Sequence, residues 1–162
     1  MMRLLVLCVV AACGGGVGVD AGPPMAELGT GELEFETIGD GDPMLVVHGP
    51  QGGYHLVGAM RASGIDPGNP NDLGDPSNPT TEFRVFRGQT RVDLMASRYT
   101  QGLNRNEDGV YEMIARRVIL DIQDDAELDG VELRVEVEVT DVHGARATDA
   151  RMVIGRPHPS NL

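Results

Sequence analysis

Short hydrophobic runs alternate with polar residues along most of the chain, and the clearest of them is VELRVEVEV (131–139). In this segment every second residue is valine or leucine, and the residues between them are charged. Successive side chains of a strand point to opposite faces, so strict alternation predicts a β-strand with one buried and one solvent-facing side. A helix would scatter the same hydrophobic residues around its axis, and we therefore prefer the strand.

The same pattern recurs in shorter segments that are separated by turn residues. We predict further strands at 32–38, 44–48, 54–62, 82–88, 90–96, 110–122 and 145–154. The segment 110–122 is long enough for either one bent strand with a bulge near the pair Arg116–Arg117 or two strands. Many short strands with turns between them predict an all-β fold, an antiparallel sandwich or barrel. We identify no internal repeat.

The last two strands carry a resemblance to a known fold. VEVTDVHGARATDARMVI (137–154) resembles the final hairpin of immunoglobulin-like domains, in which a D-x-x-G turn joins the last two strands. The resemblance implies an immunoglobulin-like antiparallel β-sandwich, which we place at residues 32–155, followed by a tail at 156–162. With the turn centred on Val142–His143, the opposed pairs would be Leu133 with Met152, Val135 with Ala150 and Val131 with Ile154, with all three pairs in the core.

One segment interrupts the series of strands. GIDPGNPNDLGDPSNPTTE (64–82) contains four prolines and three glycines and shows no hydrophobic periodicity. Loops of this length are usually functional or disordered, so we expect a long loop between two strands of the sandwich.

The first thirteen residues, MMRLLVLCVVAAC, consist of one basic residue, Arg3, and an apolar run that ends at Ala12. A bilayer span needs about 20 apolar residues, so this shorter run predicts a secretory signal peptide over residues 1–12. VAAC (10–13) resembles the lipobox of bacterial lipoproteins. The resemblance implies cleavage before Cys13, a diacylated sulfur on that residue and an acylated amino group, with palmitate as a fatty acid.

The glycine-rich segment 13–31 would then be a flexible tether between the lipid and the domain, because its composition cannot bury enough surface to form a core. GPQGGYHLVGAMRASG (49–64) resembles a segment of uncharacterised immunoglobulin-like lipoproteins of myxobacterial type, a family that carries no characterised activity. We expect a protein anchored by lipid in the bacterial cell envelope, at the outer membrane. Because Cys8 would be removed and Cys13 would carry lipid, the mature chain would have no disulfide.

Charge excludes some classes of partner and chemistry. The chain has 13 basic residues, all of them arginine, against 25 acidic residues, a net charge of −12. Loss of residues 1–12 would remove Arg3 and leave 12 − 25 = −13. A chain this acidic does not bind nucleic acid through its overall field. The lack of lysine excludes Schiff-base chemistry and a P-loop lysine.

The glycine-rich stretch HGPQGGYHLVG (48–58) raises three alternatives: a phosphate loop, a metal site or a turn. A phosphate loop leads into a helix, whereas Gly58 disfavours a helix here. A five-residue turn would place His48 opposite Tyr54 and Val47 opposite His55, which puts the two histidines on opposite faces. We therefore predict a hairpin turn.

Calcium is the one metal for which the sequence contains a pattern of candidate ligands. DAELDGVELRVE (125–136) fits D-x-x-x-D-G-x5-E, with Asp125, Glu127, Asp129 and Glu136 at the spacing of a calcium loop. The alternation after Gly130 extends the chain and carries Glu136 too far from the other ligands. A loose site would need Asp125 and Asp129 together with the candidates Asn104, Asn106 and Asp108, at one end of the sandwich.

Other binding and catalytic patterns are weak. No serine lies in G-x-S-x-G, and the mature chain would have no free thiol. Among the few aromatic residues, Tyr99 lies beside a polar loop and is the best candidate for ligand contact. We predict a non-catalytic binding or structural module, with an unknown envelope protein or ligand as its partner. A calcium-dependent adhesion or ligand-binding domain is the alternative, and an enzyme of unknown type is the next.

Overall fold

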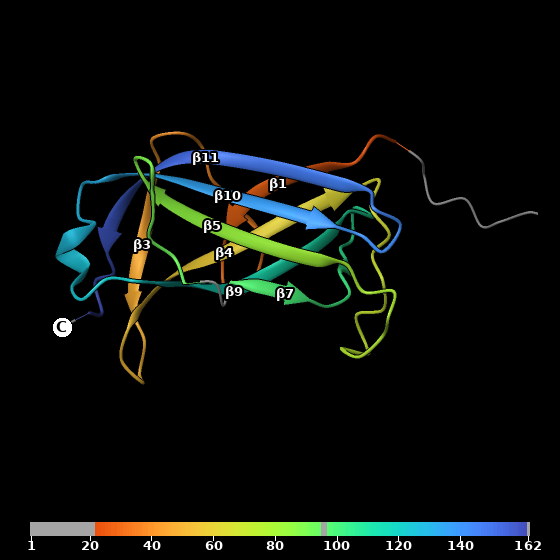
Figure 1. Cartoon of the computed structure of the whole chain (residues 1–162), viewed down its shortest axis with the longest axis horizontal. Helices are drawn as coiled ribbons and strands as arrows, with labels where there is room; N and C mark the ends of the chain where they lie inside the picture. The colour runs from red at the N-terminus through yellow and green to blue at the C-terminus, as the bar shows by residue number, and fades with distance from the viewer. Residues whose placement is uncertain (1–21, 95–96, 162) are drawn as a thin grey trace, which may run out of the picture.

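The structure is a computed structural model that describes residues 22–94 and 97–161, and it is built of β-strands (Figure 1). The strands are β1 (Met25–Thr30), β2 (Glu36–Thr37), β3 (Pro43–His48), β4 (Tyr54–Ser63), β5 (Thr80–Arg87), β6 (Thr90–Arg91), β7 (Arg98–Thr100), β8 (Asn104–Arg105), β9 (Tyr111–Leu120), β10 (Glu132–Thr140) and β11 (Arg146–Pro157). A single turn of 3₁₀ helix, η1 (Asp125–Glu127), follows β9. The prediction of an all-β fold is confirmed. Among the described residues, no helix is long and apolar enough to cross a membrane.

The strands form two layers that we call the β4 sheet and the β10 sheet. The β4 sheet contains β4 with β1 and β9 as neighbours, and β2 and β8 at its margins. The β10 sheet contains β11, β10 and β5 side by side, with β6 and β7 beside β5. Figure 1 shows the strands of one layer crossing those of the other.

Strand β3 joins the two layers and departs from the predicted antiparallel pattern. It pairs antiparallel with β4 through Val47 and His55, and parallel with β11 from Pro43 to Val46. Because β3 pairs with a strand of each layer, the hydrogen bonding runs continuously from the β4 sheet into the β10 sheet. The result is a sandwich with one parallel pair among its described strands.

The core lies between the two layers. In β10 the residues of the apolar face, Leu133, Val135, Val137 and Val139, are all fully buried. Across the core, the ring of Phe83 on β5 lies over Gly58 on β4, and a Cβ atom at position 58 would come within 2.9 Å of that ring. Glycine therefore lets the two layers approach closely at this point.

The sandwich begins earlier and ends later than the predicted boundaries at 32 and 155. Residues 25–30 form β1 inside the β4 sheet, where Leu28 is fully buried and its N–H donates to Asp149 at 2.8 Å. The tether prediction failed here because glycines on both sides of MAEL hide a short alternating strand. The remainder of the predicted tether, residues 13–21, and the predicted signal peptide lie outside the described residues.

The predicted strand 32–38 is also shorter than expected. The chain turns at residues 31–35, and only Glu36 and Thr37 pair with β1. Leu33, predicted to share a face with Phe35, is 92% exposed, whereas Phe35 is buried. Within the predicted segment 110–122 the chain forms one strand, β9 (Tyr111–Leu120). The predicted bulge is confirmed in this strand, where Ile114 and Ala115 lie opposite a single residue of β4.

The register predicted for the final hairpin is wrong by one residue. Leu133 pairs with Val153, and Val135 pairs with Arg151, so Met152 and Ala150 point away from the core. The N–H of Gly144 donates to the carbonyl oxygen of Asp141, and Gly144 adopts φ +85°. This left-handed glycine adds a third residue to the turn, as in hairpins that close with a G1 bulge, and shifts every pair.

Candidate ligand-binding groove

The glycine-rich hairpin forms a turn, and its two histidines do not converge. Val47 pairs with His55, and His48 pairs with Tyr54, as the five-residue turn predicted. His48 is exposed and packs against the ring of Tyr54, with 5.0 Å between ring centroids. His55 lies on the opposite face of the hairpin and is buried. Burial, together with the charge of Arg117, lowers the pKa of His55.

The calcium candidates lie in two separate places. Asn104, Asn106 and Asp108 belong to the hairpin that precedes β9, whereas Asp125 and Asp129 follow the end of that strand. The length of β9 separates the two groups, so they do not share one end of the sandwich. Within residues 22–94 and 97–161, no three histidine, cysteine or acidic side chains form a group that could hold a metal ion.

The acidic residues of the calcium pattern have structural partners. Asp124 caps η1, and Glu127 accepts hydrogen bonds from the backbone N–H groups of Gln123 and Asp124. Asp125 accepts a hydrogen bond from the Asn161 amide at 2.6 Å, and Asp129 pairs with Arg156 at 3.0 Å. Glu136 lies on β10 and pairs with Arg84 at 3.1 Å.

Tyr99 is half-buried and is not an open platform for a ligand. Its hydroxyl donates to the carbonyl oxygen of Arg117 at 2.6 Å, and its ring lies edge-on to Phe83. The guanidinium of Arg116 lies 5.5 Å from the centre of the same ring. Burial raises the pKa of Tyr99, and the hydroxyl stays protonated at neutral pH. These contacts fix β7 against the rest of the sandwich.

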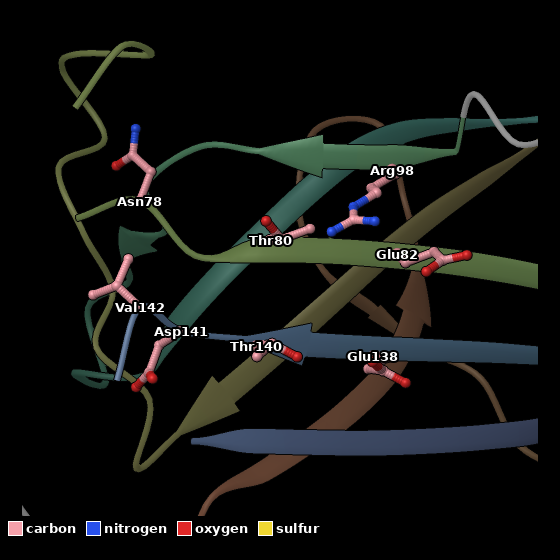
Figure 2. A pocket seen from close by; sticks show the side chains of 8 residues that line it. All are labelled: Asn78, Thr80, Glu82, Arg98, Glu138, Thr140, Asp141 and Val142. Atoms are coloured by element: carbon pink, nitrogen blue, oxygen red, sulfur yellow. The ribbon is translucent and has the colours of Figure 1, made fainter. Parts of the chain in front are cut away.

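A groove of about 330 Å³ opens instead on the outer face of the β10 sheet. Its lining residues come from strands and loops that are distant in sequence: Asn78, Thr80, Glu82, Arg98, Glu138, Thr140, Asp141 and Val142. Figure 2 shows side chains on the neighbouring strands β7, β5 and β10, with loop residues closing one end.

Strand register explains the polar floor of this groove. Thr80 of β5 lies between Thr100 of β7 and Thr140 of β10. In the next row, Glu82 lies between Arg98 and Glu138 on the same two strands. The alternation that buries valines on one face of β10 therefore presents hydroxyl and charged groups on the other.

Two carboxylates of the groove, Glu82 and Glu138, are paired with arginines outside it. Glu82 pairs with Arg91 at 3.3 Å, and Glu138 pairs with Arg84 at 3.0 Å and also with Arg146. Arg98 lies opposite Glu82, but within the described part of the chain it forms no ion pair. Among the described residues, the Arg98 guanidinium in the groove therefore has no carboxylate partner.

Asp141 holds the closed end of the groove together. Its carboxylate accepts hydrogen bonds from the backbone N–H groups of Asp66, His143 and Ala145, each at 2.9 Å. The first of these bonds ties the loop that precedes β5 to the β10–β11 hairpin. Burial alone would raise the pKa of Asp141, but the three N–H donors and nearby His143 hold it below its usual value.

The loop that walls the groove contains a repeat that sequence analysis missed. From Asp66 to Thr80 the chain reads DPG-NPN-DLG-DPS-NPT, five triplets that each begin with aspartate or asparagine. The first four of these residues accept a hydrogen bond from the N–H group two positions later, with distances from 2.9 to 3.1 Å. These are Asx turns, in which a side chain takes the place of a backbone acceptor.

The repeat makes the segment an ordered wall of consecutive turns. In three places the N–H of one leading residue also donates to the carbonyl oxygen of the leading residue before it. Asn78, the last of them, is buried, accepts from the N–H of Asn69 at 2.8 Å and donates to the carbonyl of Asp72 at 2.8 Å. The triplet spacing was the signal that could have predicted this order.

Asp141→Asn should make the protein less stable at neutral pH and less sensitive to acid. The pKa of Asp141 is lower in the folded protein than in the unfolded chain. The ionised carboxylate therefore stabilises the folded protein above the usual pKa of about 4, and this stabilisation is lost as the pH falls through the pKa of the folded state. The neutral amide of asparagine has only one acceptor oxygen and no negative charge for the three N–H groups. We therefore expect the free energy of unfolding to fall by about 1–3 kcal/mol at pH 7. Urea unfolding from pH 7 to pH 3 measures both effects.

Asp108→Asn is the matched control, because Asp108 is exposed in a turn before β9. It should leave both the stability at pH 7 and its change with pH close to those of the natural chain. Equal pH profiles for Asp141→Asn and the unaltered protein would show that this carboxylate does not stabilise the loop.

Comparisons of the chain with protein-family models, with curated proteins and with solved structures find no match. The fold and the groove therefore carry the functional argument together with the N-terminal sequence. Cys13, the predicted site of lipidation, lies outside the described residues.

Proposed function

We propose that this protein is a lipid-anchored, non-catalytic binding module of the bacterial cell envelope. The VAAC sequence that ends at Cys13 supports the anchor. The guanidinium of Arg98, which lies in a groove of fixed polar groups and has no ion pair among the described residues, is the observation that supports binding. The described chain begins at Gly22, and the residues between it and Cys13 reach at most about 30 Å.

The ionisation of Glu138 and Asp141 argues against these two groups as general acids in the groove. Burial raises the pKa of Glu138, but hydrogen bonds from Arg84 and Arg146 outweigh this effect and lower it overall. The pKa of Asp141 is lowered as well. A general acid at neutral pH needs a raised carboxylate pKa, whereas these two groups stay ionised and can only accept hydrogen bonds.

The chemistry of the lining suggests a small polar ligand that carries a carboxylate. A guanidinium binds a carboxylate through two parallel hydrogen bonds, and Arg98 is available for such a pair. Glu82 and Glu138 can accept from an ammonium or hydroxyl group on the same ligand, and the exposed Val142 offers an apolar contact. A free dipeptide combines these groups in a volume that suits the groove.

Titration of the domain with alanyl-alanine, followed by backbone NMR, tests this proposal. We expect shifts at the amides of Thr80, Thr140 and Val142 with millimolar affinity. Arg98→Gln should abolish them, because the carboxylate loses its charged partner. Arg87→Gln changes an exposed arginine at the far end of β5 and should leave the titration unchanged.

The blocked dipeptide, acetylated and amidated, lacks both charges and should not shift these amides. Shifts that persist in Arg98→Gln, or that arise only outside the groove, would contradict the proposed site. Chemical turnover of the dipeptide by the protein would contradict a non-catalytic role.

A further inference from the structure

A second groove, independent of the polar one, lies between the β1–β2 turn and β3. It has a volume of about 530 Å³, and its apolar lining includes Leu33, Leu45, Val47 and Val57. Leu33 is 92% exposed and Leu45 is 42% exposed, so two large aliphatic side chains face water in one place. Exposed apolar surface gathered in a groove is typical of binding sites.

The groove forms where the edge of β4 lacks a continuous neighbour. Strand β1 pairs with β4 from Ser63 back to Ala59, and β3 pairs with its first two residues, Tyr54 and His55. Within the described chain, no strand pairs with residues 56–58 on this side. The hydroxyl of Thr30 donates to the carbonyl oxygen of Val57 at 2.7 Å and partly fills the gap.

Acidic side chains surround the exposed leucine. Glu32, Glu34 and Glu36 line the groove and are exposed, and within residues 22–94 and 97–161 none of them forms an ion pair. The outer face of the β10 sheet differs, because Glu136 and Glu138 each pair with arginine there. Among the described residues, the three glutamates therefore have no arginine partner, and the histidine in the lining of the groove is His158.

We infer that this groove binds an extended segment of a partner protein that presents an aliphatic side chain flanked by arginine or lysine. The aliphatic side chain would pack against Leu33 and Leu45, and the basic groups would pair with the three glutamates. Charge complementarity increases the association rate and selects basic partners, and burial of the leucines supplies affinity. The groove adjoins Thr30, at the end of β1 farther from Gly22.

A labelled peptide, acetyl-Arg-Leu-Arg-Leu-Arg-amide, tests the inference by fluorescence anisotropy with the domain. We expect saturable binding that weakens as salt rises, because the glutamates are exposed. Leu33→Ser should weaken binding about tenfold through lost apolar burial. The triple variant Glu32→Gln, Glu34→Gln, Glu36→Gln should remove most of the salt dependence.

Leu73→Ser is the matched control, because Leu73 is 74% exposed in the loop before β5, outside this groove. It should bind the peptide as the unaltered domain does. The peptides acetyl-Arg-Ser-Arg-Ser-Arg-amide and acetyl-Glu-Leu-Glu-Leu-Glu-amide should both bind at least tenfold more weakly. The first lacks the aliphatic side chains, and the second lacks the basic ones.

Three results would overturn the inference. These are equal affinity in Leu33→Ser and Leu73→Ser, equal binding of the acidic and basic peptides, and self-association of the domain that Leu33→Ser abolishes while no peptide binds. The last result would assign the groove to a second copy of this chain. The peptide assay tests this groove, whereas the dipeptide titration tests the polar groove that contains Arg98. Since Arg98→Gln leaves this groove unchanged, a failure of the peptide assay is distinguishable from a failure of the dipeptide titration.

Discussion

Replacing Leu133 by alanine should lower the free energy of unfolding by about 2–5 kcal/mol. Leu133 is fully buried on the inner face of β10, opposite Val153 of β11. Its truncation removes apolar burial and leaves a cavity between two hydrogen-bonded sheets that cannot easily close over it. Urea unfolding, followed by circular dichroism, measures the change through the midpoint at constant slope.

Glu132→Ala provides the control, because Glu132 is the neighbouring residue on the same strand and points to solvent. Its effect should stay within about 0.5 kcal/mol, as for most surface substitutions. A loss of less than 1 kcal/mol for Leu133→Ala would contradict the core assigned to the inner face of β10.

Leu133 and Glu132 lie on strand β10, and this strand shows which part of the fold can be predicted well from sequence patterns. Strand β10 was predictable because its two faces meet different environments, so each position must be either apolar or polar. The partner residue on β11 was harder to predict, because it depends on the number of residues in the turn. Gly144 decides that number through its left-handed backbone, and the letters DVHG alone permit a two-residue or a three-residue turn.

The predictions for short elements failed for a different reason. In strand β1 the side chain of Leu28 is fully buried in the core, and its backbone N–H donates to Asp149, far along the chain. No local pattern contains that information. Conversely, Leu33 lies in an alternating segment, yet the chain turns at residues 31–35 and leaves its side chain in water. In both cases local alternation alone does not decide burial.

The polar groove could not be predicted as a site because its residues come from separate strands. Arg98 and Glu138 come to line the same groove only through the register of β7, β5 and β10. The wall of the groove was more accessible to prediction, since the triplets from Asp66 to Thr80 repeat Asp or Asn at every third position. Such spacing predicts successive Asx turns, which order a loop that contains many prolines.

Replacing Cys13 by serine should abolish attachment of the protein to the membrane. In the proposed lipoprotein, the sulfur of Cys13 would carry two acyl chains and its amino group would carry a third. Each buried methylene contributes about 0.8 kcal/mol, so one chain binds only marginally, whereas two or three hold a protein lastingly. Serine offers no thiol for acylation, so the variant should accumulate either with its signal peptide uncleaved or without a lipid anchor. Detergent phase separation of whole-cell extracts measures the change.

Cys8→Ser separates this role from a general effect of losing a thiol. Cys8 lies five residues earlier, inside the apolar run that cleavage before Cys13 would remove. This variant should partition into the detergent phase like the unaltered protein, and mass spectrometry of its N-terminus should find an acylated Cys13. Retention of the Cys13→Ser protein in the detergent phase after removal of the signal peptide would contradict the lipid anchor. The polar groove would then belong to a secreted protein, and the dipeptide titration would still test its binding.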